Sequence, residues 1–105
     1  MINGKTQSGF EFHVSEGLGE NAIFLRALTR MNSNSLPSAE RMTAVFELIE
    51  AVFNDREQEE QFYKHAASKD PTGRANVKTV YVEINEIVDI LAQQDESIKK
   101  SQPSP

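Results

Sequence analysis

Apolar residues recur at two different spacings along the chain, and each spacing predicts a different kind of element. Residues 10–14 alternate apolar and polar side chains, which is the two-residue period of a half-buried strand. Its apolar positions are Phe10, Phe12 and Val14. Residues 7–9 have turn chemistry, and residues 2–6 are the expected partner strand. We therefore predict a β-hairpin over residues 1–14 whose phenylalanine face packs on helices, since two strands alone are marginal in water.

Four later segments place apolar residues three and four positions apart, which is the spacing of an amphipathic helix. They predict helices over about residues 18–31, 37–53, 55–68 and 76–94. The last segment has the most regular apolar stripe, made of Val77, Val80, Tyr81, Ile84, Ile87, Val88 and Leu91. Ser15 is expected to cap the first helix and Asn54 the third, and Pro37 suits the first turn of the second.

The C-terminal end has a different character. From Asp95 the chain becomes charged and then ends in Ser-Gln-Pro-Ser-Pro, which offers little to bury. We expect residues 95–105 to form a flexible, disordered tail. The predicted fold is therefore mainly α (α+β): one globular domain over residues 1–94, with an N-terminal β-hairpin packed on a bundle of about four helices.

Composition narrows the classes of partner. The chain has 105 residues, 16 acidic and 11 basic side chains, and a formal net charge of -5. The basic residues are scattered, so we expect no nucleic-acid binding, which depends on clustered Lys and Arg. No apolar run approaches the ~20 residues of a membrane helix, and the N-terminus lacks the apolar stretch of a signal peptide. With no Cys to form disulfides, the sequence favours a protein of the cytoplasm.

Few residues are suited to catalysis or to metal binding. His13 and His65 are the two histidines, and neither has a ligand or acid–base partner three or four positions away, so both are expected to be solvated. Glu83, Glu86 and the other carboxylates resemble solvated helix borders, and residues 17–19 are too short for a phosphate loop. We therefore expect no enzymatic activity, no metal and no cofactor.

The remaining feature is an excess of large apolar side chains. Six Phe and two Tyr share a small core, and Leu48 widens the apolar stripe of the second helix. A helix that is apolar on more than one flank has several internal neighbours or an external partner. Packing within the domain is the favoured interpretation, and an exposed groove for a helical or extended client is the alternative.

Several short motifs, in this order, resemble one known family. They are Met1-Ile2-Asn3-Gly4-Lys5-Thr6, Ser8-Gly9-Phe10-Glu11-Phe12, the segment 45–53, Gln61-Phe62-Tyr63-Lys64-His65, Gly73-Arg74 and Val82-Glu83-Ile84-Asn85-Glu86-Ile87. Together they resemble the tail assembly chaperones of siphophages and prophages of Gram-positive bacteria. The resemblance covers nearly the whole chain up to Gln94.

The resemblance implies a protein of the host bacterial cytoplasm that binds the tape-measure protein and keeps it soluble during tail assembly. It also implies that no cofactor and no catalytic residues are present, and that ribosomal frameshifting can make a longer form near the tail. A client helix needs a complementary apolar surface. We expect the flanks of the second and last helices to supply that surface, with Phe46, Phe53, Tyr81 and Val88, joined by Phe10 and Phe12.

Two alternatives remain open from the sequence. One is a structural head–tail or tail-completion protein of a phage or prophage that acts through oligomerisation. The other is self-association through the client-binding surface, because an exposed apolar stripe can pair with a second copy of itself.

Overall fold

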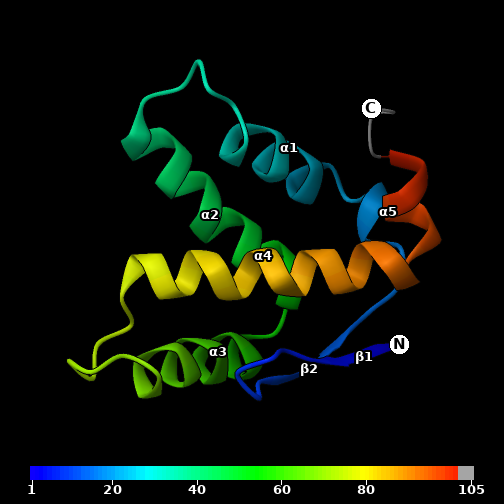
Figure 1. The fold of residues 1–105 in the computed structure, drawn as a ribbon. Coiled ribbons are helices and arrows are strands. Elements are labelled where there is room, and N and C mark those ends of the chain that lie inside the picture. Colours follow the sequence, from blue (N-terminus) through cyan, green and yellow to red (C-terminus); the bar gives the residue numbers. More distant parts are fainter. Residues whose placement is uncertain (102–105) are drawn as a thin grey trace.

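The computed structural model describes residues 1–101, with side chains as far as Ile98. Within these residues the chain is mainly helical with an N-terminal antiparallel hairpin, so the predicted fold class is confirmed (Figure 1). The elements are β1 (Ile2–Lys5), β2 (Glu11–Val14), a 3-10 helix η1 (Leu18–Glu20), α1 (Ala22–Met31), α2 (Ser38–Phe53), α3 (Arg56–Ser68), α4 (Val77–Gln94) and α5 (Glu96–Ser101).

The hairpin buries the face that its alternation predicts. β1 pairs with β2 antiparallel, with Ile2 opposite Val14 and Gly4 opposite Phe12. Phe12 is fully buried, and its ring lies so close to Gly4 that a Cβ there would sit 2.4 Å from the ring. The absence of a side chain at Gly4 therefore lets the Phe12 ring lie across the neighbouring strand.

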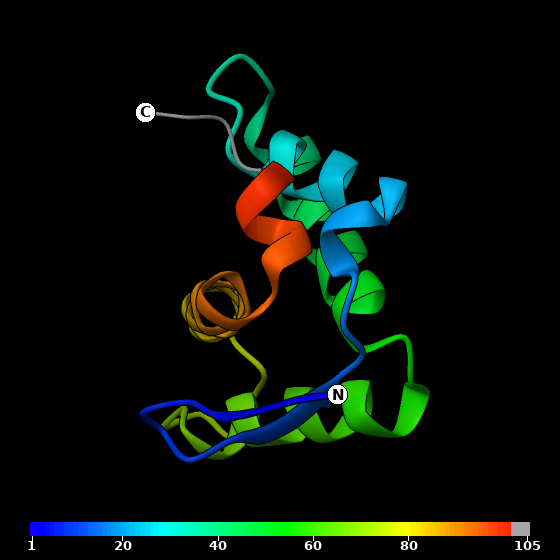
Figure 2. The same cartoon turned by 90° about the vertical axis from the view of Figure 1, so that its right-hand side faces the viewer.

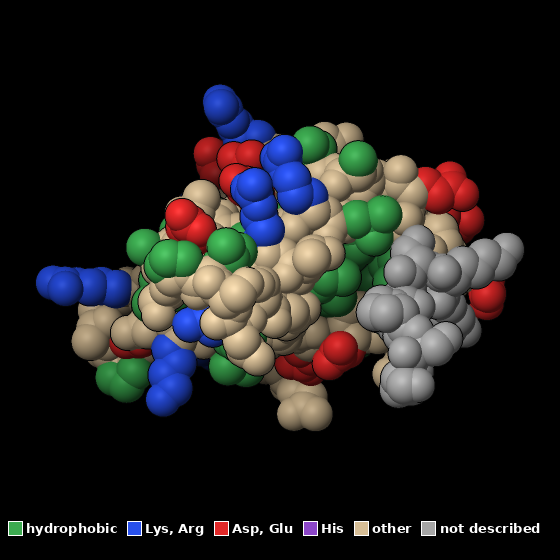
Figure 3. All heavy atoms as spheres, turned by 90° about the horizontal axis from the view of Figure 1, so that it is seen from above, with side chains coloured by type: hydrophobic (Ala, Val, Ile, Leu, Met, Phe, Trp, Pro, Cys, Tyr) green, Lys and Arg blue, Asp and Glu red, His purple; other side chains and the backbone are tan. Residues whose placement is uncertain are grey.

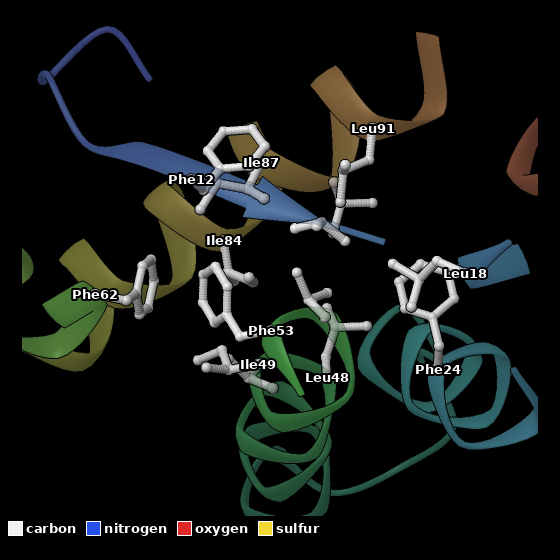
Figure 4. Packing of buried hydrophobic residues seen from close by; sticks show 14 of the residues in the cluster. Phe12, Leu18, Phe24, Leu48, Ile49, Phe53, Phe62, Ile84, Ile87 and Leu91 are labelled. Atoms are coloured by element: carbon white, nitrogen blue, oxygen red, sulfur yellow. The ribbon is translucent and has the colours of Figure 1, made fainter. Parts of the chain in front are cut away.

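An aromatic cluster joins the hairpin to the helices. The ring of Phe10 lies 6.1 Å from that of Phe53 and 5.6 Å from that of Phe62, in edge-to-face arrangements that aromatic pairs favour. Figure 4 shows Phe53 and Phe62 together with Ile84, so α2, α3 and α4 meet here. The same figure shows a second group, with Leu18 next to Phe24, at the other end of the core.

The helices form a closed ring. α1 packs on α2, α2 on α3, α3 on α4, α4 on α5, and α5 on η1, which directly precedes α1. Figure 2 shows α5 lying against η1 and the start of α1. The hairpin adds to the ring by packing β1 on α4 and β2 on α2.

Asp95 makes the contact that closes this ring. Its Oδ2 accepts hydrogen bonds from the backbone N–H groups of Gly17 and Leu18, each at 3.1 Å. Its Oδ1 accepts from the backbone N–H of Ser97 at 3.0 Å and from the Ser97 hydroxyl at 2.6 Å. One buried carboxylate therefore holds the start of η1 and the start of α5 together.

Backbone packing reinforces the junction. The N–H of Gly19 donates to Ser97 Oγ at 2.9 Å, and a Cβ at Gly19 would lie 2.2 Å from the backbone oxygen of Ser97. Ile98 of α5 is 1% exposed and belongs to the core. Only a residue without a side chain fits at position 19, where two backbone segments meet.

These contacts correct the expectation of a flexible tail from Asp95 onwards. Asp95 and Ile98 are buried, and residues 96–101 form α5, because one apolar side chain and one capping carboxylate are enough to dock this short helix. Residues 102–105, which belong to the same predicted tail, lie outside the described part of the chain.

Two predicted caps are also wrong. Asn21, not Ser15, caps α1, and its side chain accepts from the N–H groups of Ile23 and Phe24. Asp55, not Asn54, caps α3. Asn54 instead ends α2 in the left-handed conformation with φ of 47°, which asparagine adopts more readily than most residues.

Replacing Asp95 is expected to loosen the ring. Asp95→Ala removes the acceptor for both helix starts and should lower the free energy of unfolding by about 2 kcal/mol. Asp95→Asn should cost less, because the amide keeps one acceptor oxygen. Urea unfolding followed by circular dichroism measures both changes. Stability equal to that of the wild type in Asp95→Ala would contradict the role given to this carboxylate.

The same group predicts a pH dependence. Burial raises the pKa of Asp95, but hydrogen bonds from Ser97, Leu18 and Gly17 outweigh it and hold the pKa below its ordinary value. The charged form therefore stabilises the fold at neutral pH, and that contribution is lost as pH falls through the lowered pKa. The stability difference between wild type and Asp95→Asn should shrink from about pH 7 to about pH 2.5. A difference that stays constant would contradict this assignment.

Candidate functional site

The structure separates the six residues expected to form a client-binding surface. Phe46 and Tyr81 are exposed, at 41% and 39% of their surface. The other four are buried in the core, namely Phe10, Phe12, Phe53 and Val88. These four are therefore corrected from surface to core residues. Neighbouring elements of the same chain cover the apolar faces to which these residues belong. The spacing of apolar residues along the sequence does not show which elements cover a face.

Tyr81 lies in an open groove of about 390 Å³ between the N-terminal parts of α2 and α4. The groove is lined by Met31, Ser38, Arg41, Met42, Val45, Val77, Lys78 and Tyr81. We call this surface the α2–α4 groove. In Figure 1 the N-terminal ends of α2 and α4 lie at the same side of the molecule, at the left. Phe46 does not line the groove.

Helical spacing explains how these side chains come together. On α2, Ser38, Arg41, Met42 and Val45 recur three and four residues apart, and on α4 Val77 and Tyr81 are four apart. Each set therefore forms one stripe on its helix, and the two stripes face the same hollow. Met31, the last residue of α1, completes the lining where α1 ends.

The groove combines apolar walls with positive charge. Val77 and Tyr81 remain 48% and 39% exposed, and Met42 is partly buried. Arg41 and Lys78 also line the groove, and within the described residues neither forms an ion pair with a carboxylate. Such a surface can bury an apolar segment and attract negative charge at the same time.

A contrasting acidic surface lies between α2 and α3. Burial first, and then repulsion by Glu50, raise the pKa of Glu59 above its ordinary value. Burial, Glu59 and Glu50 likewise raise the pKa of Tyr63. Negative charge is therefore concentrated at this surface, whereas the cations Arg41 and Lys78 line the α2–α4 groove.

Seen from above in Figure 3, green hydrophobic side chains reach the surface in several separate places among polar atoms. The exposed large apolar side chains of the described residues are Met1, Ile23, Phe46, Val77, Tyr81 and Val82. Of these, Val77 and Tyr81 line the α2–α4 groove, which makes it the best candidate for binding another molecule.

A second group of polar residues connects the hairpin turn to two helices. The Ser8 hydroxyl donates to Glu83 Oε1 at 2.6 Å and lies 2.8 Å from Nε2 of His65. Because the only hydroxyl proton goes to Glu83, the His65 nitrogen is the donor in its contact with Ser8. Glu83 is 6% exposed, and none of the described residues donates a hydrogen bond to its Oε2. His65 of α3 donates to Ser8, and Ser8 donates to Glu83 of α4. These two hydrogen bonds anchor the hairpin turn on both helices.

His65 and Glu83 are thus less solvated than expected, since His65 is partly buried and Glu83 is buried, whereas His13 is exposed as expected. His65 also lies 5.4 Å from the ring of Phe10. His13 Nδ1 is 2.6 Å from Asn3 Oδ1, and the His13 backbone exchanges two hydrogen bonds with the Gln58 side chain. Local spacing could not show these contacts, since Ser8 lies 57 residues from His65 and 75 from Glu83.

Neither a cluster of metal ligands nor a membrane-spanning helix is found among the residues that the structure describes. No group of three or more His, Cys, Asp or Glu side chains is placed to hold a metal ion in this part of the chain. None of the helices within residues 1–101 combines the length and apolar character that a membrane crossing requires.

Comparison with known proteins adds no relative. No protein-family model, no curated protein and no solved structure matches this chain.

The anchor of the hairpin turn can be tested by a double-mutant cycle. Ser8→Ala leaves the Glu83 carboxylate buried without its donor and should destabilise the fold by about 1–3 kcal/mol. Adding Glu83→Leu to that variant removes the unpaired charge and should restore part of the loss. Urea unfolding of the wild type, both single variants and the double variant gives the coupling energy. Strictly additive effects would show that Ser8 and Glu83 do not interact.

Proposed function

We propose that this chain is a tail assembly chaperone of a phage or prophage that keeps the tape-measure protein soluble in the host bacterial cytoplasm. The observation that carries the proposal is the α2–α4 groove, an open surface with apolar walls that other parts of the described chain leave accessible. In this proposal the groove holds an apolar face of a tape-measure helix, in the manner of helix-in-groove recognition.

The chemistry of the groove suits a client that has no single fixed sequence. Met42, which is partly buried at the groove, has a flexible, polarisable side chain that adapts to apolar partners of different shape, and it packs next to the buried core that includes Met31. A shallow groove with few apolar contacts also gives limited affinity, because binding must offset lost motion of both partners. Limited affinity is appropriate for a chaperone that must leave when the tail tube forms.

The motifs that resemble the chaperone family meet in the fold. Ser8 and Phe10 of the hairpin motif contact His65 and Phe62 of the α3 motif, and Ser8 also bonds Glu83 of the α4 motif. Segments separated by more than 50 residues therefore form one junction. This favours a structural role for the motifs, which build the scaffold, while the α2–α4 groove provides the binding surface.

Co-expression provides the direct test of the proposed function. The tape-measure protein should be found in the soluble fraction when this chain is present and in the pellet when it is absent. A tape-measure protein that is equally insoluble in both cases would overturn the proposal. A stable ring-forming oligomer of this chain alone would favour the alternative, a structural head–tail or tail-completion subunit.

Groove variants make the test specific. Val77→Asp places a charge in the apolar wall of the groove and should reduce the soluble tape-measure protein several-fold, since a carboxylate there must be desolvated by the client. Val82→Asp is the matched control, because Val82 is 57% exposed on the same helix and does not line the groove. Gel quantification of the soluble client, with circular dichroism of each variant, measures the effect.

The two variants also show how the groove proposal fails. If Val77→Asp and Val82→Asp retain the wild-type fold and solubilise the client equally well, the client binds elsewhere on the chain. If both lose activity to the same extent, the effect is one of added charge and not of position. A loss confined to Val77→Asp supports the groove.

A further inference from the structure

The rim of the α2–α4 groove carries two cations that the described chain does not neutralise. Arg41 donates from Nη2 to Ser38 Oγ at 3.3 Å, but no described residue accepts a hydrogen bond from its buried Nε. Lys78 is exposed at the start of α4. The described residues supply no carboxylate within 4.0 Å of either side chain.

Both cations lie close to the start of a helix. Arg41 and Lys78 lie near the N-termini of α2 and α4, where the backbone N–H groups carry partial positive charge. The N-cap of α2 is Pro37, which has no side chain that could accept from the first N–H groups, but Glu40 lies in the first turn of this helix. At the start of α4, Asn76 Oδ1 accepts from the N–H of Lys78 at 2.9 Å. The positive charge of the groove therefore comes from Arg41 and Lys78, which line an apolar hollow in a chain whose net charge is -5.

From this charge distribution we infer that the α2–α4 groove selects an acidic amphipathic helix, with an apolar stripe bordered by Asp or Glu. The apolar stripe contacts Met42, Val77 and Tyr81, and the carboxylates pair with Arg41 and Lys78. The inference deepens the proposed function, on which it rests, by stating the chemistry of the client segment. Charge on the rest of the surface has little influence, because exposed charges more than about 10 Å apart are largely screened at moderate salt.

The contribution of the carboxylates is selective and modest. Exposed ion pairs add little affinity each, so two of them change the dissociation constant by about three- to tenfold. Apolar contact supplies the remainder of the affinity and does not discriminate between acidic and basic helices. The expected signature is therefore binding of both kinds of helix, with preference for the acidic one that declines as salt increases.

Three synthetic peptides test the preference. Each has about 20 residues, to favour helix formation, with the same leucine stripe and a fluorescent label. The positions bordering the stripe are Glu in one peptide, Lys in the second and Gln in the third. Fluorescence anisotropy with the full chain should give the order of affinity Glu, then Gln, then Lys, with about a threefold to tenfold difference between the first and last.

Charge-reversal variants locate the effect. Arg41→Glu/Lys78→Glu should abolish or reverse the preference for the Glu peptide. Arg56→Glu/Lys64→Glu is the matched control, because it reverses one Arg and one Lys on exposed positions of α3, away from the groove. This control should retain the order of affinities. Circular dichroism of both variants checks that the fold is intact.

Several results would overturn the inference. They are equal affinity for the Glu and Lys peptides, no binding of any peptide, or equal effects of the two double variants. If the wild type is a dimer in sedimentation and Arg41→Glu/Lys78→Glu dissociates it, the occupant of the groove is a second copy of this chain and the inference is overturned.

Failure of this inference and failure of the proposed function can be distinguished by experiment. Charge-independent binding alongside a soluble tape-measure protein overturns only the inference, whereas an insoluble client overturns the proposed function even if the acidic peptide binds.

Discussion

The buried carboxylate of Asp95 connects the two ends of the helical part of this protein. It accepts four hydrogen bonds, two from the start of η1 and two from Ser97 at the start of α5. Without this junction the helices would form an open chain in which each one packs only on its neighbours in sequence. With it, α5 returns to η1 and the helices close into a ring, whose interior is filled by the aromatic cluster and by the apolar face of α4.

The α2–α4 groove depends on the same closure. Its two walls, α2 and α4, are separated along the ring by α3 on one side and by α5, η1 and α1 on the other. The spacing between the walls is therefore set by packing on both sides, and the hairpin adds a third connection through β1 on α4 and β2 on α2. A groove held in this way presents its apolar side chains without first ordering them, which reduces the entropic cost of binding a client.

Sequence patterns predicted the hairpin and the long helices well, because alternation and three-to-four spacing arise from local burial. α5 was missed, since its described side chains include one deeply buried apolar group, Ile98, and the N–H groups of Gly17 and Leu18 that bond its capping residue Asp95 lie far away in sequence. Periodicity also identified the apolar stripes without showing what covers them, so Phe53 and Val88 were assigned to the surface. Tyr81 and Phe46 do remain exposed, but only Tyr81 lines the groove.

Methyl NMR of the methionines tests the central claim most directly, because the three Met residues occupy distinct places. Met31 and Met42 line the α2–α4 groove, Met31 as a buried residue and Met42 as a partly buried one, whereas Met1 is 75% exposed beside Glu16 and serves as an internal control. On addition of a tape-measure segment to saturation, the account predicts that the Met31 and Met42 methyl signals shift while the Met1 signal does not. Saturating binding that leaves Met31 and Met42 unchanged would contradict the account, because the client would then occupy another surface.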